Sequence, residues 1–127
     1  MSNNPYNEIF QTIIELSQKQ GYDTFDYLPD ENQSYPFVFV GNQQNTDIPT
    51  KDRTLGTTHI QIDVYAEFNY RSEVADIIDD LQTAIASNDT TEHFKYRVTD
   101  TSSQMIPDRT TEIALWHGIL EMDVRYL

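Results

Sequence analysis

Histidine, serine and aspartate are the residues of this chain that could do chemistry, and none of them stands in the pattern that chemistry requires. The three histidines, His59, His93 and His117, have no second ligand at metal-binding spacing, and no HExxH or EF-hand pattern is present. The serines lack the GxSxG context of a hydrolase nucleophile, and the chain contains no cysteine. We therefore predict no catalytic residue, no metal site, no cofactor and no enzymatic activity.

Three aspartates form the densest group of carboxylates. Asp76, Asp79 and Asp80 lie in a segment with helical periodicity, where Asp76 and Asp80 share one face. Like charges at this spacing destabilise a helix slightly, which would be consistent with a functional role. A solvated helix face explains the same residues more simply.

The stretch Asp47–Gly56 (DIPTKDRTLG) gathers cations in an acidic chain. Turn-forming and polar residues surround Lys51 and Arg53, so we expect a projecting loop between two strands. Projecting loops often carry function, and Asp47, Thr50, Lys51, Asp52 and Arg53 form our candidate partner-binding loop. The alternative is a solvated hairpin tip whose two cations pair with the neighbouring aspartates.

Charge restricts the classes of partner. The 127 residues include 21 acids and 8 bases, a formal net charge of -13. Tight duplex binding depends on Lys and Arg contacts to phosphate, so it is not expected. An acidic surface fits a protein that must not adhere to passing DNA, a protein that imitates DNA, or a protein that only needs solubility. The N-terminus lacks the pattern of a signal peptide and no stretch reaches a membrane span, so we expect a cytoplasmic origin and no membrane partner.

Two helices are predicted by apolar residues at three- and four-residue spacing. The first is expected to begin near Pro5 and to stop at Gly21. The second is expected to begin after Ser72 as N-cap and to end near Ser87. Their predicted buried residues are Ile9, Phe10, Ile13, Ile14 and Leu16 in the first, and Val74, Ile77, Ile78, Leu81 and Ile85 in the second.

Strands are predicted between and after the helices. The strongest pattern is Thr57–Phe68, where apolar and polar residues alternate over ten positions. The other predicted strands are 23–28, 37–41 with an extension to 46, 94–99 and 111–126. The polar stretch 99–110 is expected to be a connection.

The last predicted strand is apolar on both faces in its first half. One face carries Trp116 and Gly118, the latter a candidate bulge or close-approach point, and the other carries Ile113, Leu115 and Ile119. A sheet backed by helices on one side would expose the latter three residues, so we predict that they contact another chain. The alternative is that a helix or loop covers them.

The order of elements predicts one domain over residues 1–127. A helix, two or three strands, a helix and two strands are typical of an α+β fold. We expect a mostly antiparallel, four- to five-stranded sheet with two helices packed on one face.

Several segments together resemble the tail-completion proteins of long-tailed phages of Gram-positive bacteria, also called head-to-tail joining or tail-terminator proteins. The family has a PYVVIGE-like strand, a D-x-x-T-K-like loop, a strand of the form H-x-I-x-V-W/Y and a helix after an R/S-E-V-like start. The matching segments are Pro36–Gly41, then Asp47, Thr50 and Lys51, then His59–Tyr65, and finally Arg71–Val74.

The resemblance implies a structural virion protein at the head-tail interface, assembled in the bacterial cytoplasm. It implies a hexameric ring that caps the tail tube and docks onto the head connector or stopper, through which DNA passes without specific binding. The loop cations are then expected to reach an acidic neighbour. The alternatives are a connector adaptor or stopper, a DNA-mimic inhibitor of a host nucleic-acid enzyme and, less simply, a small enzyme.

Overall fold

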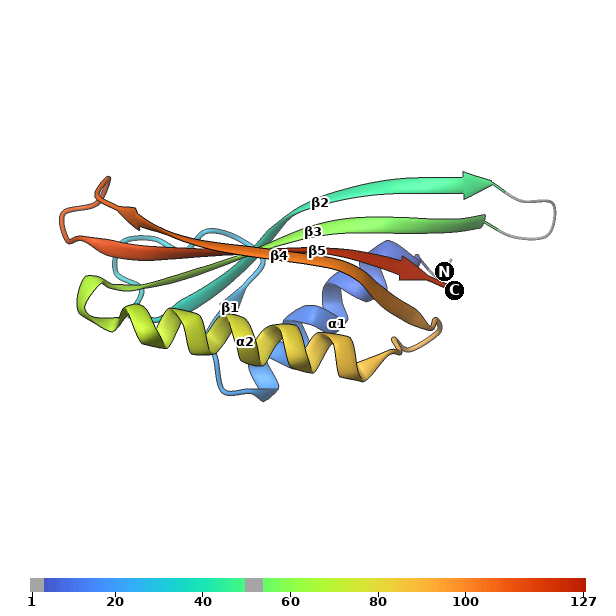
Figure 1. Cartoon of the computed structure of the whole chain (residues 1–127), viewed down its shortest axis with the longest axis horizontal. Helices are drawn as coiled ribbons and strands as arrows, with labels where there is room; N and C mark the ends of the chain where they lie inside the picture. The colour runs from blue at the N-terminus through green and yellow to red at the C-terminus, as the bar shows by residue number, and fades with distance from the viewer. Residues whose placement is uncertain (1–3, 50–53) are drawn as a thin grey trace.

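The computed structural model describes residues 4–49 and 54–127, which form one sheet and two helices (Figure 1). The helices are α1 (Pro5–Lys19) and α2 (Arg71–Asn88), and a short 3-10 helix, η1 (Phe68–Tyr70), precedes α2. The strands are β1 (Thr24–Phe25), β2 (Phe37–Pro49), β3 (Thr54–Glu67), β4 (Tyr96–Asp108) and β5 (Leu115–Tyr126). None of the described helices is long and apolar enough to cross a membrane.

The five strands lie in the order β1-β2-β3-β5-β4. Only the β1–β2 pair is parallel, and the other three pairs are antiparallel. Both helices lie on the same side of the sheet (Figure 1). The predicted α+β fold, with a mostly antiparallel sheet and two helices on one face, is confirmed.

The core fills the space between the sheet and the helices. The alternation in β3 places Ile60, Ile62 and Val64 on the helix side, each fully buried. Both helices bury the stripes expected from their spacing, although Phe10 and Leu16 are only partly buried. Burying each large aliphatic side chain contributes about 1.5–3 kcal/mol before the entropy cost is subtracted.

The predicted ends of α1 are correct, whereas the predicted start of α2 is not. Asn4 caps α1 by accepting hydrogen bonds from the amides of Tyr6 and Asn7, and the chain leaves the helix through Gly21, whose φ is +93°. The predicted N-cap Ser72 is wrong. Helix α2 already begins at Arg71 because η1 leads directly into it, and no side chain caps it.

The β2–β3 hairpin is longer than predicted. Asp47 pairs with Gly56 and Pro49 with Thr54, so part of the expected loop is strand. The hairpin extends past the ends of both helices (Figure 1). A bulge between Val40 and Asn42 shifts the alternation in β2. The polar composition of this segment concealed the strands, because hairpin residues beyond the core need not be apolar.

The predictions for β4 and β5 were wrong at their ends. Residues 100–108, predicted as a connection, continue β4, whose edge position lets polar side chains face solvent. Strand β5 begins at Leu115 instead of Thr111. Gly118 is a close-approach point, as predicted. A Cβ atom there would lie 2.5 Å from Val74 Cγ1 and 2.8 Å from Ile78 Cδ1 of α2.

Candidate functional site

The face of the sheet opposite the helices, here called the open face, carries aromatic and titratable side chains in cross-strand rows. In one row Phe37, Tyr65 and His117 are register neighbours on β2, β3 and β5. The Phe37 and Tyr65 rings stack with centroids 5.1 Å apart, and the Tyr65 and His117 rings with centroids 4.4 Å apart. Burial, followed by the nearby Asp63 carboxylate, raises the pKa of Tyr65 to about 12. The row therefore stacks three rings from three neighbouring strands.

Asp63 is a buried carboxylate on the open face. Its side chain accepts hydrogen bonds from His117 Nε2 at 2.7 Å and from Gln61 Nε2 at 3.0 Å. A buried carboxylate requires such partners. The arrangement resembles a catalytic His–Asp pair, but no serine or threonine hydroxyl within residues 4–49 and 54–127 forms a hydrogen bond to it. It fixes the orientation of the His117 ring that stacks on Tyr65.

His59 lies further along the open face, towards the hairpin. Its Nδ1 is 2.6 Å from Asp123 Oδ1, and its Nε2 is 3.4 Å from Glu121 Oε1. The hydrogen bond to Asp123 raises the pKa of His59, partial burial opposes this, and Glu121 adds to it. Within residues 4–49 and 54–127 no group of histidines and carboxylates could hold a metal ion.

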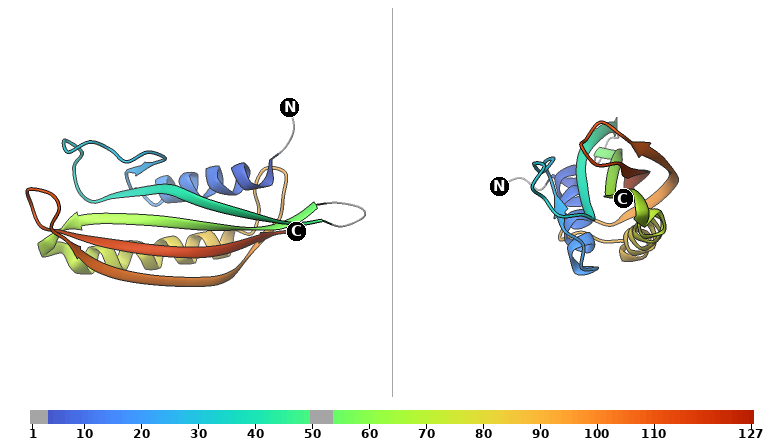
Figure 2. Two further views of the ribbon diagram at one scale, coloured as in Figure 1. Left: turned by 90° about the horizontal axis from the view of Figure 1, so that it is seen from above. Right: turned by 90° about the vertical axis from the view of Figure 1, so that its left-hand side faces the viewer.

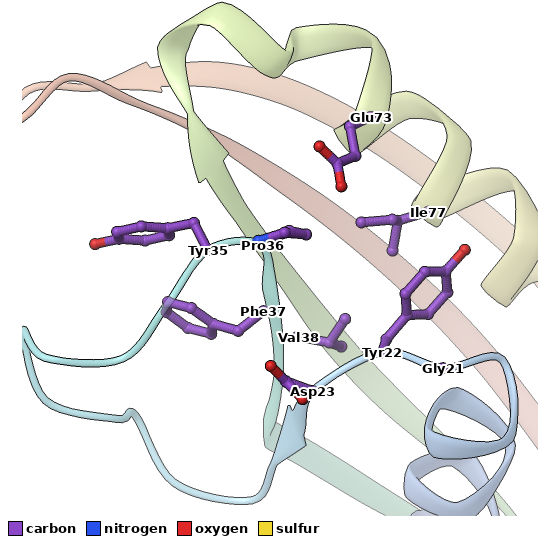
Figure 3. A pocket seen from close by; sticks show the side chains of 9 residues that line it. All are labelled: Gly21, Tyr22, Asp23, Tyr35, Pro36, Phe37, Val38, Glu73 and Ile77. Carbon is purple, nitrogen blue, oxygen red and sulfur yellow. The ribbon is translucent and has the colours of Figure 1, made fainter.

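A cavity of about 300 Å³ opens between the start of β2 and the start of α2 (Figure 3). The carboxylates of Asp23 and Glu73 and the side chains of Tyr22 and Tyr35 line it. The Tyr22 hydroxyl donates a hydrogen bond to the carboxylate of Asp80. One of the three aspartates noted in the sequence therefore has a structural contact. Burial and then Asp80 raise the pKa of Tyr22 to about 12, so its hydroxyl is a weak acid and stays protonated at neutral pH.

The predicted partner-binding loop is described only at its first residue. Asp47 lies near the end of β2. Its carboxylate accepts a hydrogen bond from the Tyr6 hydroxyl, which connects the hairpin to α1. Gln43 Nε2 also donates to the carbonyl oxygen of Tyr6 at 3.0 Å. Thr50, Lys51, Asp52 and Arg53 lie outside the described residues.

The predicted subunit-interface residues do not share one environment. Ile113 is 48% exposed in the turn before β5, whereas Ile119 is half-buried on the open face. Leu115 is only 2% exposed, so the expectation that it is available to another chain is wrong. The turn that precedes β5 changes the alternation, and therefore residues 113 and 115 do not lie on one strand face.

A match to a known family covers most of this fold. The model of a family described as "Tail completion protein gp17" matches residues 15–127, which include α2 and all five strands. The chain belongs to this tail completion family. The resemblance inferred from sequence segments is thereby confirmed, and membership of this family favours a structural role over an enzymatic one.

Two solved structures are similar to this member of the tail completion family. A chain from the "Virion of native gene transfer agent (GTA) particle" has a TM-score of 0.69 and 12% sequence identity, covering 96% of this chain and 93% of that one. The "Structure of bacteriophage SPP1 gp17 protein" has a TM-score of 0.62 and 19% identity, covering 94% of this chain and 88% of that one. At these identities the likeness concerns the fold. No curated protein matches the chain.

One surface of this tail completion protein was missed by sequence reasoning. Phe68 of η1 stacks on Trp116 of β5, with ring centroids 5.2 Å apart and an interplanar angle of 11°. Arg71 lies over the Trp116 ring at 5.1 Å, and Arg109 lies over the Phe68 ring at 5.6 Å. These residues are up to 48 positions apart in the sequence, so no local spacing could have indicated the cluster.

Proposed function

We propose that this chain is a structural component of the phage virion that caps the tail tube and joins the tail to the head connector as a hexameric ring. The observation that carries the proposal is the family match over residues 15–127. A similar fold in a chain of a gene transfer agent virion supports a place within a particle. The location is the head-tail interface.

A closed ring requires two different surfaces on each subunit, one for each neighbour. Ile113 contributes to one of them because it is 48% exposed, and Ile119 contributes from the open face. The ring also provides a channel for DNA. A net charge of -13 gives the channel wall no general attraction for phosphate, so DNA passes without specific binding.

The test of this function is a phage in which the gene for this chain carries an early stop codon. Filled heads and complete tails are expected to accumulate separately in electron micrographs, and the purified chain added to the extract should restore joined particles. Tails isolated from cells that make no heads should carry the protein, whereas a connector adaptor or stopper would instead remain with the heads. Joined, infectious particles from the mutant would rule out this role, and a DNA-mimic inhibitor would be absent from purified particles.

Lys51 and Arg53 contact an acidic neighbour in this proposal, either the tail-tube protein, the connector or the next subunit. The Lys51→Glu/Arg53→Glu variant is expected to remain folded, with an unchanged circular dichroism spectrum, and to lose head-tail joining. The matched control is Lys19→Glu/Lys95→Glu, which changes the net charge by the same amount at two exposed positions elsewhere. Normal head-tail joining by the Lys51→Glu/Arg53→Glu variant would show that the loop cations are not needed for assembly.

A further inference from the structure

The cluster of Phe68, Arg71, Arg109 and Trp116 has the composition of a binding surface. Together with the exposed Ile113 of the turn between Arg109 and β5, it is here called the basic aromatic patch. Phe68 is 38% exposed and Ile113 is 48% exposed, and both arginines are exposed. Aromatic residues and arginine are the types most enriched where protein interfaces gain their affinity. The stacking of the arginines on the rings holds their guanidinium groups in place.

The two arginines of the basic aromatic patch have no ionic partner among the described residues. Every ion pair within residues 4–49 and 54–127 involves a histidine, so no described carboxylate lies within 4.0 Å of Arg71 or Arg109. In a chain with 21 acids and 8 bases, the patch is an exception to the surrounding negative charge. A guanidinium group that already stacks on a ring can still form bidentate bonds to a carboxylate of another chain.

A second exposed surface has the complementary composition. The segment Asp26–Glu31 (DYLPDE), here called the acidic loop, follows β1. Tyr27 and Leu28 are both 61% exposed, the largest values among the large hydrophobic residues described. Asp26, Asp30 and Glu31 flank them, and all three are exposed. The acidic loop therefore offers carboxylates and apolar side chains together, as the basic aromatic patch requires.

The two surfaces lie at the same end of the molecule, where the acidic loop follows one edge strand, β1, and the turn that carries Arg109 and Ile113 follows the other edge strand, β4. The start of β2, at Phe37, is aligned through Tyr65 with His117 of β5, which places the preceding loop at the end where β5 begins. The loop over 26–36 and the turn over 109–114 both lie at that end (Figure 2, left). Strands β1 and β4, from which they emerge, are the two edges of the sheet.

This placement suits a ring. A rotation about an axis roughly parallel to the strands brings one edge of the sheet to the opposite edge of a second copy, with both ends at the same height. Such a contact joins two different patches, and repeating the same rotation from copy to copy can produce a closed ring.

We propose that the basic aromatic patch of one copy binds the acidic loop of the next copy in the ring. The inference rests on the proposed function, because it assigns the surfaces by which the ring closes. Arg71 and Arg109 pair with the carboxylates of Asp26 and Glu31, while Leu28 packs against Ile113. The contact gives strongly acidic subunits a local attraction that outweighs their general repulsion.

The first test reverses charge on each side of the contact. Arg71→Glu/Arg109→Glu and Asp26→Arg/Glu31→Arg are each expected to keep the fold and to weaken association about tenfold or more at each contact, with a loss of joined particles. Combining all four changes in one chain should restore joining. The matched control for the first variant is again Lys19→Glu/Lys95→Glu. Normal joining by both reversed variants, or no recovery in the combined chain, would overturn the inference and leave the proposed function intact.

The second test uses the absence of cysteine in the natural chain. Phage carrying Leu28→Cys/Ile113→Cys are treated with a short bismaleimide, and the chain is followed on a denaturing gel. We expect a ladder of linked copies that ends at the number of subunits in the ring. Leu28→Cys/Thr83→Cys, with the second thiol exposed on α2, should give no ladder. Particles that contain the chain but give no ladder with the first pair would refute the contact alone, whereas particles of the natural phage that lack the chain would refute the proposed function as well.

Discussion

At the scale of single residues, the fold changes the ionisation of His59. Asp123 and Glu121 favour its protonated form, and its folded-state pKa is therefore above the ordinary value of 6.5. A raised pKa means that the folded state binds the proton more tightly than the unfolded state does. The contribution of His59 to stability is thus complete below about pH 6.5 and is lost as the pH rises through the folded-state pKa.

Replacement of His59 by glutamine should remove this pH dependence. The free energy of unfolding, measured by urea denaturation between pH 5.5 and 9, is expected to be lower for His59→Gln than for the natural chain at acidic pH. The difference should shrink as the pH rises. Asp123→Asn is the control, since it should lower the pKa of His59 in an NMR titration while keeping the ring. A difference between the two proteins that stays constant across this pH range would contradict the assignment.

At the scale of elements, α2 packs closely against β5 because residue 118 is a glycine and has no side chain. A Cβ atom would meet Val74 Cγ1 at 2.5 Å, and the χ1 angle of a valine in a helix is stiff. Gly118→Ala is therefore expected to lower the free energy of unfolding in urea by about 1–3 kcal/mol through overpacking.

A double-mutant cycle tests the cause of this loss. Val74→Ala removes the nearest methyl group, so the double variant should be more stable than the sum of the two single losses predicts. Strict additivity would show that the helix does not approach the strand at this point. The cycle needs no assay of assembly, and its result is independent of the ring.

The elements that could be predicted from sequence are those whose burial produces a pattern. The stripe from Val74 to Ile85 and the alternation from Ile60 to Val64 each report one buried face, and both were confirmed. The outer part of β4 was missed because an edge strand with a solvated surface has no apolar period to detect. The basic aromatic patch was missed because η1, β5 and the turn at Arg109 meet only in three dimensions.

At the scale of the whole molecule, the excess of acids determines how the chain behaves near DNA. A protein gains duplex affinity by placing Lys and Arg against phosphates, and this chain carries a net charge of -13. We expect no saturable binding to a labelled DNA duplex in fluorescence anisotropy at about 50 mM salt, a concentration at which such contacts are strong. A basic DNA-binding protein measured in parallel serves as the positive control. DNA binding that weakens steeply with added salt would contradict the proposal that the chain lines a channel without attracting DNA.

The two central strands, β3 and β5, set the length of the molecule. Twelve consecutive residue pairs join β3 to β5, from Gly56 with Tyr126 to Glu67 with Leu115, without a register shift, whereas β2 and β4 each contain a bulge. Twelve residues of antiparallel strand span about 40 Å. Two unbroken strands of this kind resist bending, so the distance between the hairpin and the opposite end of the molecule is fixed by the length of the sheet.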